Sequence, residues 1–198
     1  MIKNIIFDFG NVLVEWNMHY LFDNIIKDPE RCDYFLKNVC NQEWNSQMDA
    51  GKPIAQGIAE RIQLFPEWKN EIPLYYERWQ EAIPGEIPGM YQLATNLKDK
   101  GYTLYGLSNW SSETFPTTRD LYPVFKLFKG YIVSGYEHLI KPDPKIFQLL
   151  IDRYQLKKEE SVFIDDTPRN IIAAQQFGIK SILFKNCNQL KEELSKIL

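Results

Sequence analysis

The chain has 198 residues, of which 44% are hydrophobic and 25% are charged, and its formal net charge is -3. This length and apolar content are enough for one sizeable hydrophobic core and a modest insertion. The small negative charge and the absence of a Lys/Arg-rich segment argue against binding to nucleic acid or to an anionic membrane surface.

The first predicted element is an apolar strand that ends on a carboxylate. Ile5 to Phe9 forms a run of the buried type that is interrupted only by Asp8. An unpaired buried charge costs several kcal/mol, so Asp8 is the first candidate for chemistry. No basic segment followed by a long apolar stretch begins the chain, so we expect neither a signal peptide nor a membrane span.

The second predicted unit is helical. Residues 15–84 contain helix-forming residues and no run of the strand type, and they include Trp16, Trp44, Trp68 and Trp79. We interpret this segment as a cap whose tryptophans form its own core rather than stacking on a substrate. The breaker-rich segment Pro84–Gly89 is typical of a hinge. These features predict a cap domain of residues 15–84 inserted into a core domain of residues 1–14 and 85–198.

The remainder of the chain alternates strand and helix patterns. Short apolar runs recur at Tyr102–Leu107, Tyr131–Val133, Val162–Ile164 and Ile182–Phe184. Helical patterns lie between them, and two of these patterns stop at Gly101 and Gly178. This alternation is typical of a parallel sheet that helices cover on both faces. The predicted fold class is therefore α/β, a Rossmann-like parallel sheet of about five strands sandwiched by helices, with a helical cap after the first strand.

Polar residues end four segments of the chain, one of which is Gly135–Ile140. They are Asp8, Ser108 with Asn109, Lys141, and Asp165 with Asp166. In an open parallel sheet the reactive groups gather at the carboxyl ends of the strands, so the four clusters should converge. Each cluster also has an ordinary explanation: the acidic pair as a charged helix start, the Ser-Asn pair as a turn, the lysine as a surface residue.

The four clusters resemble, in order and context, the motifs of the haloacid dehalogenase superfamily over nearly the whole chain. The matching segments are Asp8–Leu13, Leu107–Asn109, Lys141–Pro144 and Ile164–Asn170. The resemblance implies a cap that closes over the site and helps to choose the substrate. The pattern Asp-x-Gly-Asn-Val with Asp-Asp-x-x-x-Asn is most similar to the sugar-phosphate phosphatase branch typified by α-D-glucose-1-phosphate phosphatase.

For the reacting centre, the resemblance implies an enzyme, a phosphoric monoester hydrolase that forms an aspartyl-phosphate on Asp8. Because nucleophile and phosphate are both anions, a cation should bridge them, and Mg²⁺ prefers oxygen ligands. Asp8, Asp166 and the main-chain carbonyl of Gly10 would supply these ligands. Asp165 is either a further ligand or part of a helix-start charge pair. Asn170 would either orient a ligand carboxylate or cap its helix locally.

For the phosphate, Ser108 and the backbone N–H of Asn109 would hold oxygens of the phosphoryl group. Lys141 would offset the negative charge on the nucleophile and on the phosphate. Ser108 and Lys141 thus join the predicted catalytic set, and Ser108, Asn109 and Lys141 form the predicted phosphate-binding set.

Gly10 departs from the family pattern. The phosphatases usually have an aspartate at this place, which protonates the leaving oxygen and then activates water, and glycine can do neither. Loss of a general acid and base typically costs about 10² to 10⁴ in rate. Glu15 and His19, just beyond the turn, are the candidate substitutes. A good leaving group, such as the anomeric hydroxyl of a sugar, would need less protonation.

The sequence therefore predicts a Mg²⁺-dependent phosphatase of a small phosphorylated metabolite, with a sugar phosphate as the favoured substrate. One alternative is a metal-free 2-haloacid dehalogenase, and another is a non-catalytic protein that binds a phosphorylated ligand or a protein partner. The predicted partner is a small metabolite, with no nucleic acid and no membrane. The three cysteines, Cys32, Cys40 and Cys187, match no disulfide or zinc-ligand spacing, which fits a reducing cytoplasm.

Overall fold

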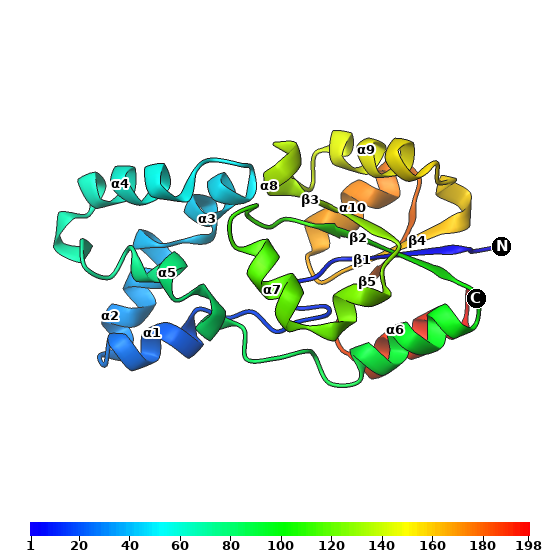
Figure 1. The fold of residues 1–198 in the computed structure, drawn as a ribbon, viewed down its shortest axis with the longest axis horizontal. Helices are drawn as coiled ribbons and strands as arrows, with labels where there is room; N and C mark the ends of the chain where they lie inside the picture. Colours follow the sequence, from blue (N-terminus) through cyan, green and yellow to red (C-terminus); the bar gives the residue numbers. More distant parts are fainter.

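A computed structural model describes residues 1–198, which form a five-stranded, all-parallel sheet with strand order β3-β2-β1-β4-β5. The strands are β1 Asn4–Phe7, β2 Thr103–Ser108, β3 Gly130–Val133, β4 Ser161–Asp165 and β5 Lys180–Leu183. The central strand β1 lies between β2 and β4, as Figure 1 shows. The predicted α/β class and parallel sheet are confirmed.

Helices cover both faces of the sheet (Figure 1). On one face lie α6 Met90–Asp99 and α11 Cys187–Ser195, and on the other lie α9 Pro144–Tyr154 and α10 Pro168–Phe177. Side chains along β1 alternate between the two layers, because Ile5 and Phe7 belong to one apolar cluster and Ile6 to the other. A strand buried in this way on both faces reads as a continuous apolar run, which is why β1 was recognisable from sequence. Two shorter helices, α7 Phe115–Leu121 and α8 Ser134–Glu137, follow β2 and β3.

Residues 15–84 form no strand of the sheet and fold into helices beside the carboxyl ends of the strands (left of Figure 1). The helices are α1 His19–Ile25, α2 Pro29–Tyr34, α3 Gln42–Asp49, α4 Ile54–Leu64 and α5 Leu74–Glu77, with a π-helical turn at Phe35–Val39. Aromatic rings fill this unit: Phe35 and Trp68 have ring centroids 5.0 Å apart, and Trp44 and Tyr75 are 5.2 Å apart. Trp44 and Trp68 therefore pack in the helical unit's own core. The exact division into core and cap domains stays a prediction.

The chain enters and leaves this helical unit through two adjacent segments. Ile87 donates a backbone hydrogen bond to the Leu13 carbonyl at 2.8 Å, and Glu15 donates one to the Gly85 carbonyl at 2.9 Å. The two connections are thus paired in antiparallel fashion around Val14 and Glu86. The pairing fixes the root of the helical unit next to the turn that follows Asp8.

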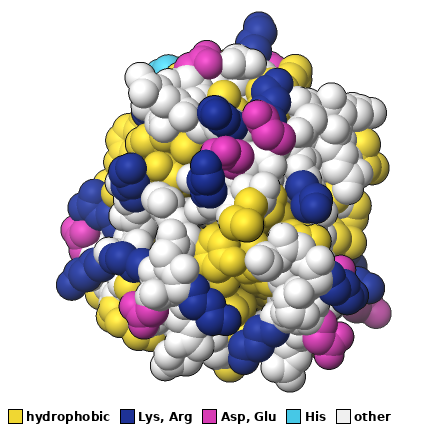
Figure 2. All heavy atoms as spheres, turned by 90° about the vertical axis from the view of Figure 1, so that its right-hand side faces the viewer, with side chains coloured by type: hydrophobic (Ala, Val, Ile, Leu, Met, Phe, Trp, Pro, Cys, Tyr) yellow, Lys and Arg dark blue, Asp and Glu magenta, His cyan; other side chains and the backbone are white.

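The opposite end of the molecule, where the strands begin, has a different surface. Figure 2 shows this face, on which basic and acidic side chains are interspersed around an exposed apolar area. A shallow hollow near the start of β2 is lined by Lys98, Tyr102, Thr103, Leu104, Leu127, Phe128 and Lys129, and includes no carboxylate. None of the helices has the length and apolar character needed to cross a membrane.

Candidate active site

Three adjacent strands bring the predicted site residues to one edge of the sheet. Asp8 directly follows β1, and the flanking strands β2 and β4 end on Ser108 and Asp165. The Asp8 backbone N–H extends the sheet by donating to the Ile164 carbonyl at 2.8 Å. The predicted convergence of strand ends is therefore what the parallel topology produces.

Lys141 is the buried cation of the site. Its Nζ lies 2.8 Å from Asp8 Oδ2 and 2.6 Å from Asp165 Oδ2, and its side chain is 0% exposed. Burial by itself lowers the pKa of Lys141, but the carboxylates of Asp165 and Asp8 outweigh burial and raise that pKa above its ordinary value. Lys141 is thus a fixed positive charge between two acids rather than a surface lysine.

Asn109 positions Lys141 through its side chain. Asn109 Oδ1 accepts a hydrogen bond from the Lys141 backbone N–H at 2.8 Å, and Asn109 Nδ2 donates to the Lys141 carbonyl at 3.0 Å. This reciprocal pair joins the loop after β2 to the turn before α9. Only a backbone role was predicted for Asn109, and this role of its side-chain amide was not predicted from sequence.

Asp165 is fully buried, and donors surround both of its oxygens. Oδ1 accepts from the Thr167 backbone N–H at 2.7 Å, Oδ2 accepts from Lys141, and the Asn170 amide lies 3.0 to 3.2 Å from both. These bonds favour a role for Asp165 in holding Lys141 over direct metal ligation. Asn170 Oδ1 is buried without a hydrogen-bond partner beside this cluster.

The acids fit a hard divalent cation. Oxygen atoms of Asp8, Asp165 and Asp166 lie within 4.8 Å of one another. Burial raises the pKa of Asp8 to about 7, with Asp165 and Asp166 adding to the rise and Lys141 opposing it. Burial also raises the pKa of Asp166, with Asp165 adding to it. Carboxylate oxygens are the ligands that Mg²⁺ prefers, so this donor set fits Mg²⁺, with Asp8 and Asp166 as the available ligands.

A cavity of about 330 Å³ opens above these acids, between the strand ends and the helical unit. Its 15 lining residues include only three hydrophobic ones. Of the predicted site residues, the lining includes Asp8, Gly10, Ser108, Asn109, Asp166 and Asn170. Lys141 and Asp165 lie behind Asp8, with exposed fractions of 1% and 0%. The predicted nucleophile, phosphate-binding residues and metal ligands thus lie together, some on the cavity lining and others behind it.

Several lining residues were not predicted from sequence. The helical unit contributes Trp16, Gln42, Asn45, Asp49 and Trp79, and the fourth motif contributes Arg169. Trp16 and Trp79 pack against each other with ring centroids 5.8 Å apart. The expectation that the cap tryptophans serve only its core therefore holds for Trp44 and Trp68 but is incomplete for Trp16 and Trp79. Arg169 could have been predicted, because it lies within the fourth motif. No pattern in residues 15–84 identified the lining residues of the helical unit.

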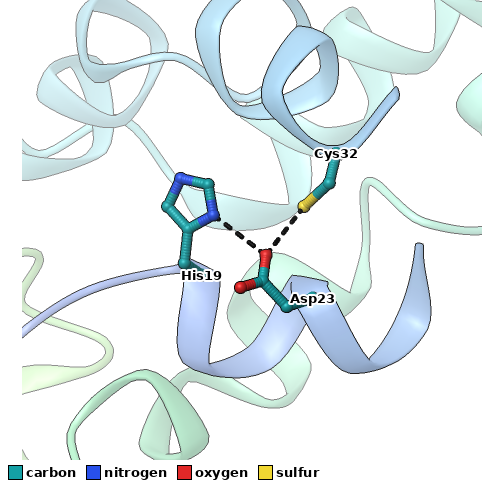
Figure 3. Close-up of side chains that lie close together, drawn as sticks. All are labelled: His19, Asp23 and Cys32. Atoms are coloured by element: carbon teal, nitrogen blue, oxygen red, sulfur yellow. Dashed lines mark hydrogen bonds and ion pairs between the residues drawn. The ribbon is translucent and has the colours of Figure 1, made fainter. Parts of the chain in front are cut away.

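Neither Glu15 nor His19, the candidate substitutes for the absent acid, lines the cavity. Glu15 is exposed and accepts a hydrogen bond from the Tyr20 hydroxyl at 2.5 Å. His19 Nδ1 lies 2.9 Å from Asp23 Oδ1 (Figure 3). The same oxygen accepts a hydrogen bond from the Cys32 thiol, with a distance of 3.3 Å between Sγ and Oδ1. Burial raises the pKa of that thiol to about 12, so the thiol is a hydrogen-bond donor within the helical unit.

The family assignment follows from a comparison with family models. The model of the haloacid dehalogenase-like hydrolases matches residues 2–178. The chain belongs to this family. A sesquiterpene phosphatase from Aspergillus oryzae is 27% identical over 181 residues, which cover 89% of this chain and 87% of that protein. A glyceraldehyde 3-phosphate phosphatase from Pyrococcus abyssi is 27% identical over 122 residues, which cover 61% of this chain and 51% of that protein.

Solved structures share the fold. A HAD family enzyme from Bacteroides thetaiotaomicron in a magnesium complex superposes with a TM-score of 0.75 at 20% identity, covering 98% of both chains. An Asp-to-Ala mutant of that enzyme, in complex with magnesium and inorganic phosphate, superposes with a TM-score of 0.73 at 21% identity, covering 94% of this chain and 95% of that chain. Some curated relatives are much longer, and the match spans only 20% of mouse bifunctional epoxide hydrolase 2. The chain is thus a HAD-like hydrolase with phosphatases among its relatives, and its likeness to the glucose-1-phosphate branch stays a prediction.

Proposed function

We propose that the protein is a Mg²⁺-dependent phosphatase that hydrolyses a small phosphorylated metabolite through an aspartyl-phosphate on Asp8. The observation that supports this proposal is the position of Asp8 on the cavity lining, with Lys141 Nζ 2.8 Å from one carboxylate oxygen. The other oxygen, Oδ1, accepts the Phe9 backbone N–H at 2.7 Å. These two donors orient the carboxylate for attack on phosphorus.

The surrounding residues are suited to bind the phosphate, to stabilise its charge and to hold the metal ion. Ser108, at the end of β2, lines the cavity and is suited to hold a phosphate oxygen through its hydroxyl, together with the backbone N–H of Asn109. Lys141 stabilises the ionised form of Asp8 and offsets charge on the phosphoryl group. Asp8, Asp166 and the Gly10 carbonyl would hold Mg²⁺, which when bound supplies the positive charge that offsets repulsion between the carboxylate and the phosphate.

The character of the cavity supports a polar leaving group. Only three of its 15 lining residues are hydrophobic, namely Trp16, Trp79 and Trp110, and its volume of about 330 Å³ suits a small ligand. A long apolar leaving group, such as a sesquiterpenyl chain, would leave many of the polar lining groups unpaired. Indole faces beside amide and charged side chains suit a sugar ring. We therefore favour a sugar phosphate as the substrate.

A panel of phosphorylated sugars and p-nitrophenyl phosphate, assayed with Mg²⁺ and with a chelator, tests the proposal. We expect phosphate release that needs Mg²⁺ and that falls to background in Asp8→Asn, which keeps the size of the side chain but removes its nucleophilic charge. Asp99→Asn, at an exposed position at the end of α6, is the matched control and should retain activity.

Release that survives the chelator or the Asp8→Asn change would contradict the mechanism. If no phosphomonoester is turned over while Mg²⁺ and phosphate still bind, the protein is a binding member of the family instead.

A further inference from the structure

The cavity contains one carboxyl group that the proposed mechanism does not use. Its lining includes three carboxyl side chains, Asp8, Asp49 and Asp166, and no Glu, His, Cys, Lys or Tyr side chain. Asp8 is the nucleophile and Asp166 is a metal ligand in the proposed function. We propose that Asp49, from the helical unit, is the general acid and base of the reaction and takes the place that Gly10 leaves empty. This inference rests on the proposed phosphatase function.

Asp49 is oriented by its own helix. It is the last residue of α3 and is only 3% exposed. Asn45, one helical turn earlier, donates its amide N–H to Asp49 Oδ2 at 3.0 Å. The Tyr76 hydroxyl donates to Asn45 Oδ1 at 2.8 Å and so holds the amide in this orientation. No further side chain donates to the Asp49 carboxyl group, whose other donor is the Ser111 backbone N–H, and Asp49 lines the cavity.

The end of α3 is attached to the sheet domain. Ser134 donates its hydroxyl to the Asp49 carbonyl at 2.5 Å and accepts the Trp110 backbone N–H at 2.9 Å. Gly51, two residues later, packs so closely that an added Cβ would lie 2.2 Å from the His138 ring. These contacts hold the Asp49 backbone against α8, and Ser134 links it to Trp110 in the loop that follows β2.

The charges around Asp49 suit proton transfer. Burial raises the pKa of Asp49 to about 7, the negative charge of Asp8 adds to the rise, and the Ser111 backbone N–H and Lys141 oppose it. Asp166 and Arg169 line the same cavity as Asp49, and the neighbouring Tyr75 and Tyr76, whose own pKa values are raised by burial, stay neutral. A group whose pKa lies near the working pH can both donate and accept a proton during turnover.

Asp49 donates and then regains the proton that is transferred in the two steps. In the first step an Asp8 oxygen bonds to phosphorus, the bond from phosphorus to the leaving oxygen breaks, and that oxygen takes its electron pair and the Asp49 proton. In the second step the Asp49 carboxylate removes a proton from water as the water oxygen bonds to phosphorus. The bond between phosphorus and Asp8 breaks, its electron pair returns to Asp8, and free phosphate leaves with Asp49 protonated again.

The backbone at Gly10 has room for the side chain that it lacks. An added Cβ would meet only Trp110, at 4.0 Å, and Gly10 does not have a positive φ. A Cβ atom at this position therefore meets no clash. The molecule thus offers a rescue experiment in which the proton donor is moved from the helical unit to the turn after β1.

The first test uses Asp49→Asn and leaving groups of different basicity. For β-glycerophosphate, whose alkoxide leaving group needs protonation, kcat should fall about 10²- to 10⁴-fold. With p-nitrophenyl phosphate, whose leaving group needs no proton, formation of the aspartyl-phosphate should be nearly unchanged. We expect a burst of one nitrophenolate per enzyme followed by slow turnover, because water attack then lacks its base. Glu43→Gln, exposed on the same helix, is the matched control and should behave like the wild-type protein.

The second test is the double variant Asp49→Asn with Gly10→Asp. Its kcat for β-glycerophosphate should be at least 10-fold higher than that of Asp49→Asn alone, and the burst with p-nitrophenyl phosphate should disappear. If Asp49 had a purely structural role, Asp49→Asn would lower kcat for both substrates equally, with no burst, and Gly10→Asp would not restore activity. That result would overturn the inference. Unchanged β-glycerophosphate turnover in Asp49→Asn would also overturn it. Absence of turnover by the wild-type protein on every phosphomonoester would instead reject the proposed function itself.

Discussion

Asp49 is a buried carboxyl whose ionisation opposes folding. Its pKa is about 7 in the folded protein and 3.8 for an ordinary aspartate. Between these values the folded state binds more protons than the unfolded state, so the contribution of Asp49 to stability becomes less favourable as the pH rises from about 4 to 7 and is constant above that. A group retained at such a cost fits a catalytic role better than a structural one.

Asp49→Asn should therefore stabilise the protein in a pH-dependent way. The free energy of unfolding of the variant minus that of the wild-type protein should grow from pH 4 to pH 7 and then level off, reaching about 1 to 4 kcal/mol. Urea titrations in the presence of a chelator measure this difference at each pH. Glu43→Gln should show no such trend, and a difference for Asp49→Asn that is equal at all pH values would contradict the prediction.

At the scale of elements, the turn that presents Asp8 depends on an aromatic cluster beneath it. Phe9 packs against Phe125 and Phe115, with ring centroids 4.9 and 5.7 Å away. Gly106 on β2 makes room for the Phe9 ring, because an added Cβ would lie 2.1 Å from Phe9 Cζ. The Asp8 backbone is therefore held by the sheet on one side and by this packing on the other.

Gly106→Ala should force Phe9 to move. Overpacking of a tight core typically costs about 1 to 3 kcal/mol, and here the displaced residue is adjacent to the nucleophile, so kcat should fall as well. Thermal unfolding and steady-state kinetics measure the two effects. Gly85→Ala is the matched control, because an added Cβ at Gly85 meets nothing within 4 Å, and its stability should change by less than about 1 kcal/mol. Equal effects of the two substitutions would show that the Phe9 contact is unimportant.

At the scale of the whole molecule, the site lies between two units that are joined by two paired connections. The sheet domain supplies Asp8 and Asp166, and the helical unit supplies Asp49 and the Trp16–Trp79 pair. A ligand that binds the acids of the sheet therefore stabilises the folded protein by an amount that grows with the logarithm of its concentration divided by its dissociation constant, because the unfolded chain has no such cluster.

Addition of Mg²⁺ to chelator-treated protein should raise the temperature of thermal unfolding. At 100 times the dissociation constant, the gain in the free energy of unfolding should be about 2.7 kcal/mol. Asp166→Asn removes one predicted ligand and should abolish most of this shift, while Asp143→Asn, in the turn before α9, should leave it intact. A shift that persists in Asp166→Asn would mean that the cation binds elsewhere.

Much of the fold was predictable because its signals are local. Strands buried on both faces produce apolar runs such as Ile5–Phe9, and Gly101 and Gly178 end the preceding helices in left-handed conformations with φ of 92° and 95°. Parallel topology then places all strand carboxyl ends at one edge, so Asp8, Ser108 and Asp165 were expected to meet. The limits of the strands differed by one to two residues: β1 ends at Phe7, and the chain turns at Phe9, whose carbonyl accepts the Leu13 N–H at 2.8 Å.

Local sequence patterns were enough to predict the α/β class, the helical insertion and the nucleophile candidate, and to show that Gly10 lacks the expected side chain. Long-range packing decided which other carboxyl group lines the cavity, because the orientation of a helical unit depends on contacts such as Ser134 with Asp49. It also removed Glu15 and His19 from the cavity and brought Asp49 into it. The position of a strand end in a parallel sheet can be predicted from the local sequence pattern. The neighbours of a residue at the end of a cap helix are set only when the two units pack together.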